Sequence, residues 1–572
     1  MDTYMRAPSR LYILNTEGST IFSLNTEDAV FSSNLIRLSD GRVAFFGRIH
    51  DWQTSMVLHA IDVQSQAWGE SIDLPANVMN VFSGFDEYLV IVDDGVNLSG
   101  IHYETAEPVR IFNWAESMVS PEGLGNVSFL HDGRVLFTTA TLTPDSTELI
   151  TLSRTAQDDI PIRTTLRLAT TQISRELMSA VAEFNRTNAF YVIEVNEINI
   201  NWDAPSADFT RLALDIITGN GPDIMVTTGL PFHQWAGQGL FVDLYELIDM
   251  DPTLSRDHIL DVALSNAETN GRLYRIFPRF SVNTMVGRPD VVGSEPGWTM
   301  GELVSILEAN PQATSPFGMG FDGRHIFRLM FMNSINNFVN WELGTVYFES
   351  DHFLELLEYA YRLHEALEWE GTGYFVINAA LTREMLASGE QLVVITDIAC
   401  FNAMFVMMYV LGEDFIIKGI PSEHGSGQLM DVSLNSLSIS SISEHQEGAW
   451  EFIRMILSEG WQRRNIVEVG FPTNRVVFNE RIGLALSGEG VETATWGGIF
   501  MYGTDFLPED TSPVVNATLA LIASTDGIVE GSDPLLDIVF ETLDDLFRGQ
   551  ITTEDAARII QNRAQTFVNE QN

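Results

Sequence analysis

The segment that decides the fold is GNGPDIMVTTGLPFHQWAGQGLFVDL, residues 219–244. A Gly/Asn/Pro turn leads into the apolar run DIMV, which predicts a short strand, and a loop broken by glycines follows. The segment contains no obvious nucleophile, metal cluster or phosphate-binding loop. Its loop therefore offers hydrogen-bonding groups without a catalytic side chain.

The residues around this segment alternate between strand and helix patterns. Strands are predicted at Thr165–Ala169 and in AFYVIEVNEI, and helices at Ser174–Asn188 and in ADFTRLALDIITGNG. This βαβαβ order predicts a mostly parallel sheet covered by helices. Later helices are predicted in GWTMGELVSILEAN, SDHFLELLEYAYRLHEALE, HQEGAWEFIRMILSEGWQRRNI, DPLLDIVFETLDDLFRG and TTEDAARIIQNRAQTFVNEQ.

The loops that follow the predicted strands are the first candidates for a site, because open α/β sheets bind ligands beyond the carboxyl ends of their strands. Thr171 and Gln172 follow the first strand, and Thr227 and Thr228 follow the third. Hydroxyl and amide groups before a helix N-terminus can hold hydroxyls or anions. Simple capping of the next helix is the alternative.

Three later segments add polar residues to the candidate site. RLYRIFPRFSVNTMVGRPD alternates apolar and polar residues and carries Arg279 and Ser281, with a salt-bridged surface arginine as the alternative. FDGRHIFR places Arg324 and His325 after a glycine turn. Asp397 ends the apolar strand in VVITDIACF, and capping of the following helix is the alternative.

Two tryptophans lie in glycine-rich contexts, Trp298 in GWTM and Trp496 in TWGGIF, whereas Trp235 lies on a predicted helix and is expected in the core. Exposed aromatic faces in a cleft suit sugars. The C–H-rich faces of pyranose rings stack on them, while polar side chains take the hydroxyls.

Motifs of common catalytic and metal sites are absent from the sequence. It contains no G-x-S-x-G, H-E-x-x-H, C-x-x-C, G-x-G-x-x-G or Walker sequence. DMDPTLSRDHIL begins like a calcium loop but lacks the required Gly and Glu. Paired carboxylates are numerous in so acidic a chain, so their number does not indicate glycoside hydrolysis. We expect no catalytic residue, no metal and no cofactor.

The composition indicates a multidomain globular protein with an excess of acids. The 572 residues exceed one ordinary domain, and a hydrophobic share of 45% suffices for packed cores. The formal net charge is −47, and Lys418 is the only lysine. Such acidity argues against binding to nucleic acids or anionic membranes. Cys400 is the only cysteine, which excludes an intrachain disulfide, and we expect it to be buried.

Residues 1–158 have a different pattern, with short β runs and frequent turns. LSDGRVAFFG around Asp40, GFDEYLVIVD around Asp86 and LHDGRVLFTT around Asp132 follow one another at intervals of 46 residues. A period of this size is typical of a propeller blade of about four strands. About three blades cannot close a ring. We therefore expect either a fragment whose partner blades lie upstream or a small β array that packs on the next domain.

From about residue 163 to the end, the sequence resembles extracellular solute-binding proteins of family 1, the carbohydrate receptors of ABC importers. The opening segment resembles the first family signature, NGRLYRIFPRF the approach to the hinge, and GWTMGEL a short helix start. LASGEQLVVITD, LSISSISEHQEGAWEFIRMILSEGWQ, GFPTNR and LDDLFRGQITTEDAARIIQNRAQTFVNEQ are similar to later family elements in the same order.

The resemblance implies an α/β, two-lobed periplasmic-binding-protein-like fold (type II) at residues 163–572, preceded by an all-β propeller-like fragment at residues 1–158. It implies a lobe one of about 163–280 plus 433–480, and a lobe two of about 284–432 plus part of 485–572. The implied ligand loops carry Thr171–Gln172, Thr227–Thr228, Arg279–Ser281, Arg324–His325, Thr396–Asp397 and a loop near Asp533.

We therefore expect a monomeric extracellular receptor at the cell surface, not an enzyme, that delivers a carbohydrate to ABC permease subunits by closing two lobes around it. The location is expected from the family, since neither an export signal nor a lipobox is visible in the chain. The alternatives are a surface sensor or interaction protein that uses the β repeats, and a polysaccharide-active enzyme.

Overall fold

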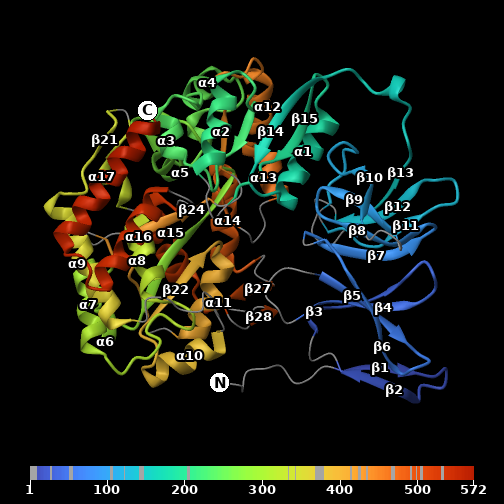
Figure 1. The fold of residues 1–572 in the computed structure, drawn as a ribbon, viewed down its shortest axis with the longest axis horizontal. Coiled ribbons are helices and arrows are strands. Elements are labelled where there is room, and N and C mark those ends of the chain that lie inside the picture. Colours follow the sequence, from blue (N-terminus) through green and yellow to red (C-terminus); the bar gives the residue numbers. More distant parts are fainter. Residues whose placement is uncertain are drawn as a thin grey trace. The chain divides into compact units, whose positions relative to one another are not determined.

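A computed structural model describes most of the chain, which forms two compact units (Figure 1). The N-terminal unit comprises Met1–Thr165 and Ile173–Glu194, and the C-terminal unit comprises Leu166–Gln172 and Val195–Asn572. The described residues are 10–25, 29–49, 56–75, 77–102, 107–121, 123–140, 147–201, 206–332, 334–341, 343–367, 379–412, 415–422, 427–432, 436–465, 470–489, 493–496, 499–502, 507–529 and 534–571.

The described strands of the N-terminal unit form a hairpin and three antiparallel sheets. The hairpin pairs β1 with β2, and the sheets have the orders β3-β4-β5-β6, β10-β9-β8-β7 and β11-β12-β13. The strands are β1 (Arg10–Leu14), β2 (Thr20–Asn25), β3 (Ala29–Arg37), β4 (Val43–Ile49), β5 (Met56–Asp62), β6 (Ala67–Asp73), β7 (Asn80–Phe85), β8 (Tyr88–Asp93), β9 (Asn97–His102), β10 (Pro108–Asn113), β11 (Val127–Phe129), β12 (Val135–Ala140) and β13 (Thr147–Leu152).

The repeat seen in the sequence corresponds to a repeated structural unit. Its three turns join β3 to β4, β7 to β8 and β11 to β12, which are the first two strands of each sheet. Asp40 accepts hydrogen bonds from the backbone N–H and Nε of Arg42, at 3.0 and 2.7 Å. Asp132 accepts the same pair from Arg134, at 3.2 and 2.8 Å. The Asp-Gly-Arg turn is thus self-contained, with the intervening glycine at positive φ in both cases.

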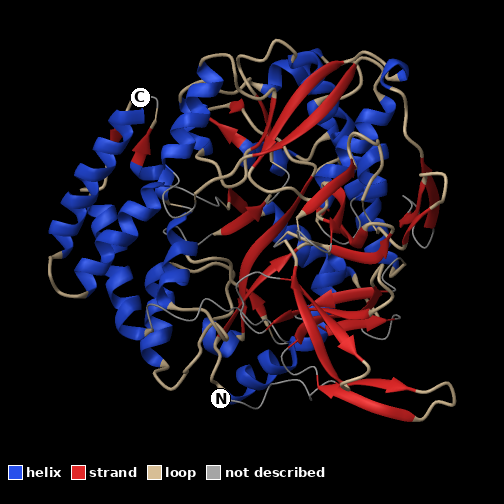
Figure 2. Ribbon diagram, turned by 45° about the vertical axis from the view of Figure 1, so that its right-hand side comes forward, coloured by secondary structure: helices blue, strands red, loops and turns tan. Residues whose placement is uncertain are grey.

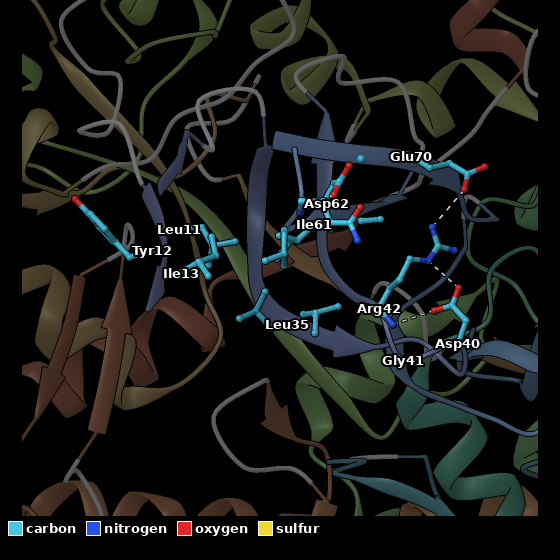
Figure 3. Close-up of a pocket in the computed structure, with 15 residues that line it drawn as sticks. Leu11, Tyr12, Ile13, Leu35, Asp40, Gly41, Arg42, Ile61, Asp62 and Glu70 are labelled. Atoms are coloured by element: carbon cyan, nitrogen blue, oxygen red, sulfur yellow. Dashed lines mark hydrogen bonds and ion pairs between the residues drawn. The ribbon is translucent and has the colours of Figure 1, made fainter. Parts of the chain in front are cut away.

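The propeller-like arrangement of these sheets stays a prediction. The three repeats differ in how far the side chains at equivalent positions are buried. In the first sheet, Leu35 and Val43 are 54% and 39% exposed, and a groove of about 780 Å³ lies between this face and β1 (Figure 3). Arg42 lies at the edge of the groove, between Asp40 and Glu70. At the equivalent positions of the other two sheets the side chains are buried, namely Val81, Leu89, Val127 and Val135.

The N-terminal unit also contains helix α1 (Arg175–Thr187) and the first residues of β15 (Tyr191–Glu197). Ser174 is the N-cap and accepts a hydrogen bond from the N–H of Leu177 at 3.1 Å, and Asn188 is the C-cap. The helix predicted from Ser174 to Asn188 is therefore confirmed to its caps. Thr171 and Gln172 do not cap it.

The first sheet of the C-terminal unit has the order β15-β14-β16-β25. Strand β14 (Thr164–Thr170) runs parallel to β16 (Ile224–Val226), and Leu168 is opposite Ile224. Strand β25 (Leu437–Ile439) returns from far along the chain and pairs antiparallel with β16. The strands predicted at Thr165–Ala169, in AFYVIEVNEI and in the apolar run of the opening segment are confirmed as β14, β15 and β16, and the sheet is parallel where β14 meets β16.

The second sheet has the order β22-β19-β24-β29. Its long central strand, β19 (Arg279–Gly287), pairs antiparallel with four strands: β22 (Val393–Ile398), β23 (Ile416–Ile417), β24 (Gln428–Asp431) and β26 (Phe471–Pro472). Strand β29 (Thr525–Ile528) runs parallel to β24. In Figure 2 the helices of this unit lie around its strands.

The five later helices predicted from the sequence are confirmed, one of them as the consecutive helices α12 and α13. The C-terminal helix α17 packs beside α16 and α9, and its Gln561 accepts a hydrogen bond from the N–H of Phe348 at 2.6 Å (Figure 1). The helices are α2 (Ser206–Ile217), α3 (Phe232–Gly237), α4 (Leu244–Met250), α5 (Asp261–Ala267), α6 (Pro289–Val292), α7 (Met300–Ala309), α8 (Gly323–Met332), α9 (Asp351–Ala366), α10 (Ala379–Ser388), α11 (Phe401–Leu411), α12 (Gln446–Leu457), α13 (Glu459–Asn465), α14 (Arg475–Ser487), α15 (Ser512–Ala523), α16 (Pro534–Phe547) and α17 (Thr553–Gln571).

The remaining strands are short: β17 (Glu268–Thr269), β18 (Arg272–Leu273), β20 (Val339–Asn340), β21 (Thr345–Val346), β27 (Thr493–Trp496) and β28 (Ile499–Tyr502). The described residues also form three short turns of 3-10 helix: η1 (Gln157–Asp159), η2 (Arg256–His258) and η3 (Ile335–Phe338).

A buried carboxylate connects two helices of this unit. Asp251, at the end of α4, accepts hydrogen bonds from Trp450 Nε1 on α12 at 2.8 Å and from the N–H groups of Thr253 and Leu254 at 2.7 and 2.9 Å. Arg454 lies 3.2 Å from the same carboxylate. Burial alone raises the pKa of Asp251, but these hydrogen bonds outweigh it and lower the pKa to about 2. The charged form therefore stabilises the fold.

Candidate functional site

The chain passes between the two sheets of the C-terminal unit at two adjacent places. Ile276 forms a β-bridge with Leu437, which begins β25 of the first sheet. A few residues later, Ser281 of β19 pairs with Asp431, which ends β24 of the second sheet. At both places the paired residues run antiparallel, and we call the two places the crossing segments. Their position between two α/β layers is where a hinge would lie.

One face of β19 is polar and accessible to solvent at this crossing. Arg279, Ser281 and Asn283 are half-buried, whereas Phe280 and Val282 between them are fully buried. This alternation follows from the two-residue period of a strand, which points successive side chains to opposite faces. The alternating pattern in the sequence therefore placed Arg279 and Ser281 on one face.

Two aspartates from the neighbouring strands join this face. Asp397 of β22 is opposite Asn283, and Asp431 of β24 is opposite Ser281. Asn283 Nδ2 lies 3.5 Å from Asp431 Oδ2. We call these residues the β19 polar cluster: Arg279, Ser281, Asn283, Asp397 and Asp431. The cluster offers carboxylates as acceptors and an arginine, an amide and a hydroxyl as donors.

The pKa of Asp397 is raised to about 6. Desolvation by the surrounding protein atoms is the main cause, and repulsion from Asp431 adds to it. A hydrogen bond from Ser281 and the charge of Arg279 act in the opposite direction. Asp397 nevertheless stays accessible to solvent, because nearby protein atoms can desolvate a carboxylate without covering it completely. Asp397 lies within β22, and Cys400 is the residue before α11, so Asp397 does not cap that helix.

The loops after β14 and β16 lie together, because these strands are parallel neighbours. Thr171 Oγ1 donates to the carbonyl of Thr228 at 3.1 Å. The hydroxyl of Thr228 is buried and has no hydrogen-bond partner among the described residues. Thr227, by contrast, is buried and bonded to Ser436 at 2.9 Å, and Gln172 is exposed. The exposed Gln172 and the half-buried Thr171 can thus meet a ligand, whereas the hydroxyl of Thr228 is covered by protein atoms and Thr227 bonds to Ser436.

Arg324 and His325 lie at the start of α8, against α16. The guanidinium of Arg324 lies 5.0 Å from the ring centre of Phe540. Its charge also acts on Asp537, whose pKa is raised mainly by desolvation. His325 Nδ1 lies 2.7 Å from the buried carboxylate of Asp322. These contacts attach the pair to Asp322 and to α16, which are not strands of the β19 polar cluster.

Among the remaining predicted site residues, the structure describes the side chain of Thr396 but not those of Trp496 and Asp533. Thr396 is buried on the face of β22 opposite to Asp397. Trp496 ends β27, but its side chain lies outside the described residues, as does Asp533. Trp298 is buried, with its Nε1 donating to the carbonyl of Gly419 at 2.7 Å, and Trp235 is in the core as predicted. Cys400 is half-buried, so the expectation of a buried thiol was wrong.

A concave surface of the C-terminal unit, about 750 Å³, lies away from the β19 polar cluster and contains none of the predicted site residues; we call it the second surface. It is lined by α3, the segment 265–270, Arg275, the β20–β21 region and β29. Its aromatic residues are Trp341 and Tyr347. Its volume is within the range of small-molecule sites, so it competes with the β19 polar cluster as a place for a ligand.

Sequence reasoning missed Asp431 as a site residue and did not select Asn283. Asn283 continues the i, i+2 pattern of Arg279 and Ser281, so this pattern could have identified it. Asp431 ends an apolar strand, as Asp397 nearly does, but only the pairing of β24 with β19 brings the two carboxylates together. Within the described residues, no group of His, Cys, Asp and Glu side chains is arranged to hold a metal ion.

The model of the family described as bacterial extracellular solute-binding protein matches residues 179–475, just over half of the chain. The chain belongs to this family. The members of this family bind solutes. A search of curated proteins gave no significant match for this solute-binding protein.

Solved structures similar to this solute-binding protein include a periplasmic solute-binding protein from Pectobacterium atrosepticum, at 16% identity and a TM-score of 0.45, covering 71% of this chain and 99% of that one. The sugar-binding protein MalE from Xanthomonas citri is 13% identical with a TM-score of 0.47, covering 71% and 98%. An ABC substrate-binding protein from Listeria monocytogenes, in complex with cycloalternan, is 15% identical with a TM-score of 0.43, covering 71% and 100%.

The helices in the described part of this solute-binding protein are all too short or too polar to cross a membrane.

Proposed function

We propose that this solute-binding protein is the receptor of an ABC importer and binds an oligosaccharide or a similar polyhydroxylated solute. It acts as a monomer outside the cell and passes the solute to permease subunits. The observation that carries the proposal is the β19 polar cluster, because it gathers donors and acceptors on an open strand face where the chain crosses between two α/β layers.

The chemistry of the cluster suits sugar hydroxyls. A hydroxyl donates one hydrogen bond and accepts others, so it can bridge a carboxylate such as Asp397 and a donor such as Arg279. Charge-assisted hydrogen bonds of this kind are stronger than neutral ones. The exposed amide of Gln172 supplies a further group from the loop after β14.

The two crossing segments support closure as the binding motion. A ligand that contacts both layers stabilises the closed state by its differential affinity, and only a few backbone torsions at the crossing must change. Small-angle X-ray scattering with and without ligand checks this point. We expect a smaller radius of gyration with ligand, and an unchanged value at saturation would reject closure.

A thermal-shift and calorimetry screen tests the function itself, since a ligand that binds only the folded state raises the Tm. The panel contains mono-, di- and oligosaccharides, linear and cyclic, with amino acids and dipeptides as the control class. We expect stabilisation by at least one saccharide and by no control. Stabilisation by peptides alone would reject a carbohydrate ligand.

Three single variants locate the site with the saccharide found. Asp397→Asn probes the β19 polar cluster, Arg324→Ala the start of α8, and Tyr347→Ala the second concave surface. We expect Asp397→Asn and Arg324→Ala to weaken binding by about 1–3 kcal/mol, because each leaves a partner unpaired, and Tyr347→Ala to leave it unchanged. The reverse result would move the site to the second surface.

A polysaccharide-active enzyme is the second candidate, and one observation favours it. Asp397 has a raised pKa and stands near a second carboxylate, Asp431, as the general acid and its partner do in glycoside hydrolases. Incubation of the protein with the bound saccharide and analysis of the products by chromatography separates the candidates. Intact saccharide after stoichiometric binding supports the receptor, and turnover supports the enzyme.

A further inference from the structure

Helix α1 is shared between the solute-binding family and the β-repeat region. The family model begins at residue 179, inside α1. The helix nevertheless belongs to the same compact unit as the β repeats. The boundary between the two units therefore does not coincide with the boundary between the two sequence patterns.

The N-terminal end of α1 meets a buried carboxylate of the β repeats. Asp93 is fully buried and accepts hydrogen bonds from Trp114 Nε1 at 2.8 Å, from the N–H of Gly95 at 2.9 Å and from Asn80 Nδ2 at 2.8 Å. Nη2 of Arg175, the first residue of α1, lies 3.8 Å from Oδ2 of Asp93. Because a buried carboxylate needs compensating charge, this contact stabilises both partners.

Hydrogen bonds from three further residues hold the rest of the helix and its C-cap. Ser179 Oγ lies 2.6 Å from Ser120 Oγ, in the segment after β10. Asn185 Nδ2 donates to the carbonyl of Ala115 at 3.3 Å. Arg163, between the repeats and β14, donates to the carbonyls of Asn185 and Asn188 at 2.5 and 3.0 Å. The contacts therefore extend along the whole length of α1.

The burial of α1 is unusual for a helix at the edge of a domain. All six residues from 177 to 182 are buried, together with Phe184 and Asn185. A surface helix buries one stripe at a period of 3.6 residues, so an unbroken run of buried residues means that more than one face is covered. The β repeats cover the face that carries Arg175 and Ser179.

We infer that the β-repeat region is a brace for the ligand loop, with Arg175 and Ser179 as positioning residues that act through α1. The chain runs from Thr171 and Gln172 to the N-cap Ser174 without any intervening element. Contacts that hold the first turn of α1 therefore restrict the loop that carries two proposed ligand groups. The ligand-binding part of this inference rests on the proposed function, but the brace itself does not.

The brace predicts reciprocal coupling. If the β repeats limit the motion of the loop, a ligand that orders the loop must also stabilise the contacts of α1 with the repeats. The coupling free energy arises because a loop already restricted by the brace has less conformational entropy to lose when the ligand binds.

Hydrogen exchange measured by mass spectrometry on the full-length chain tests the brace without any ligand. We expect Arg175→Gln and Ser179→Val to speed exchange of the amides of residues 171–174 by about fivefold or more, while the strands of the second sheet keep their rates, because local opening is separate from global unfolding. An arginine at the first helical position opposes the helix dipole, so its removal alone does not weaken α1. Faster exchange in the loop therefore reports the lost contact with Asp93.

Arg134→Gln is the matched control, since it removes the same charge from the same unit at a turn remote in sequence from α1. Equal loop exchange in Arg175→Gln, Arg134→Gln and wild type would overturn the brace, as would a uniform increase over all amides. Arg175→Lys, which keeps the charge, should restore most of the protection. If a saccharide from the screen binds, its Kd should rise in Arg175→Gln but not in Arg134→Gln. If no saccharide binds, the exchange rates still show whether the β repeats restrict the loop, and only the proposed carbohydrate ligand is rejected.

Discussion

The two units of this chain use their acidic residues in different ways. In the β repeats, Asp40 and Asp132 each bond the arginine of their own turn, and the buried Asp93 accepts three hydrogen bonds. In the C-terminal unit, Asp397 and Asp431 lie on the same face of the second sheet, and their repulsion contributes to the raised pKa of Asp397. In a chain with a net charge of −47, the number of acids therefore does not locate a site, whereas the crowding of two acids distinguishes the proposed one.

The largest effect is expected where a paired acid is removed. Asp251→Ala should lower the free energy of unfolding by about 3 kcal/mol, because Trp450 Nε1 and Arg454 lose a buried acceptor. Urea denaturation measures this, with Asp249→Ala as the control, since Asp249 is an exposed residue of the same helix. An intact unfolding free energy in Asp251→Ala would mean that paired acids do not hold this fold.

The acid stability of the protein follows from the same residue. The pKa of Asp251 is about 2 in the folded protein, below the ordinary value for aspartate. Its contribution to stability is therefore present above about pH 4 and is lost as the pH falls toward 2. We expect Asp251→Asn to lose less stability than the wild type between pH 5 and pH 3, as measured by urea denaturation at each pH. An equal loss of stability in Asp251→Asn and in the wild type over this pH range would contradict the low pKa of Asp251.

Asp397, which stands near a second carboxylate, should affect stability in the opposite way to Asp251. Asp397→Asn should weaken saccharide binding about tenfold or more, since a neutral amide replaces a charged acceptor. It should leave the stability at pH 7 unchanged or slightly higher. A folded-state pKa of about 6 means that the stability due to Asp397 is full below about pH 4 and is lost as the pH rises through 6. A loss of stability at pH 7 would place Asp397 among the structural acids.

Binding should depend on pH through the same carboxylate. If sugar hydroxyls donate to the charged form of Asp397, binding weakens about three- to tenfold as the pH falls from 7.5 to 5. Calorimetry at both values measures the change, and Asp397→Asn should flatten it. A wild-type affinity that rises on acidification would show that the protonated carboxyl donates to the ligand instead.

The smallest effect is expected at the exposed turns of the repeats. Asp132→Asn keeps one acceptor for the backbone N–H of Arg134 and loses only an exposed ion pair. We expect the Tm to shift by no more than about 2 °C. A larger shift would show that the repeated turns contribute more to the fold than their exposure indicates.

Several features were predictable because they depend on residues close together in the chain. The caps of α1 at Ser174 and Asn188 and the equivalent turns at Asp40 and Asp132 follow from local hydrogen bonding. The strand at residues 224–226 was predictable from its short apolar run after a turn. The alternation along β19 also placed Arg279 and Ser281 on one face. The individual site assignments stay predictions, because no ligand contact tests them.

Other features depend on residues far apart in the chain. Asp431 lies about 150 residues after Ser281 in the sequence, so only strand pairing makes it a neighbour. Thr227 follows its strand as Thr228 does, but a partner at Ser436 buries it. The membership of α1 in the N-terminal unit is of the same kind, since Asp93, Ser120 and Ala115 all precede the family domain.

The sequence by itself determined the elements, the repeat and the family, because hydrophobic period, capping and turn chemistry act within a few residues. The tertiary structure alone decided which polar groups meet. Asp397 and Asp431 became a crowded pair, and Arg175 a partner of Asp93, when strands and a helix from distant parts of the chain packed together. Burial and like-charge repulsion arise only at that stage, and they separate the acids of the proposed site from those that hold the fold.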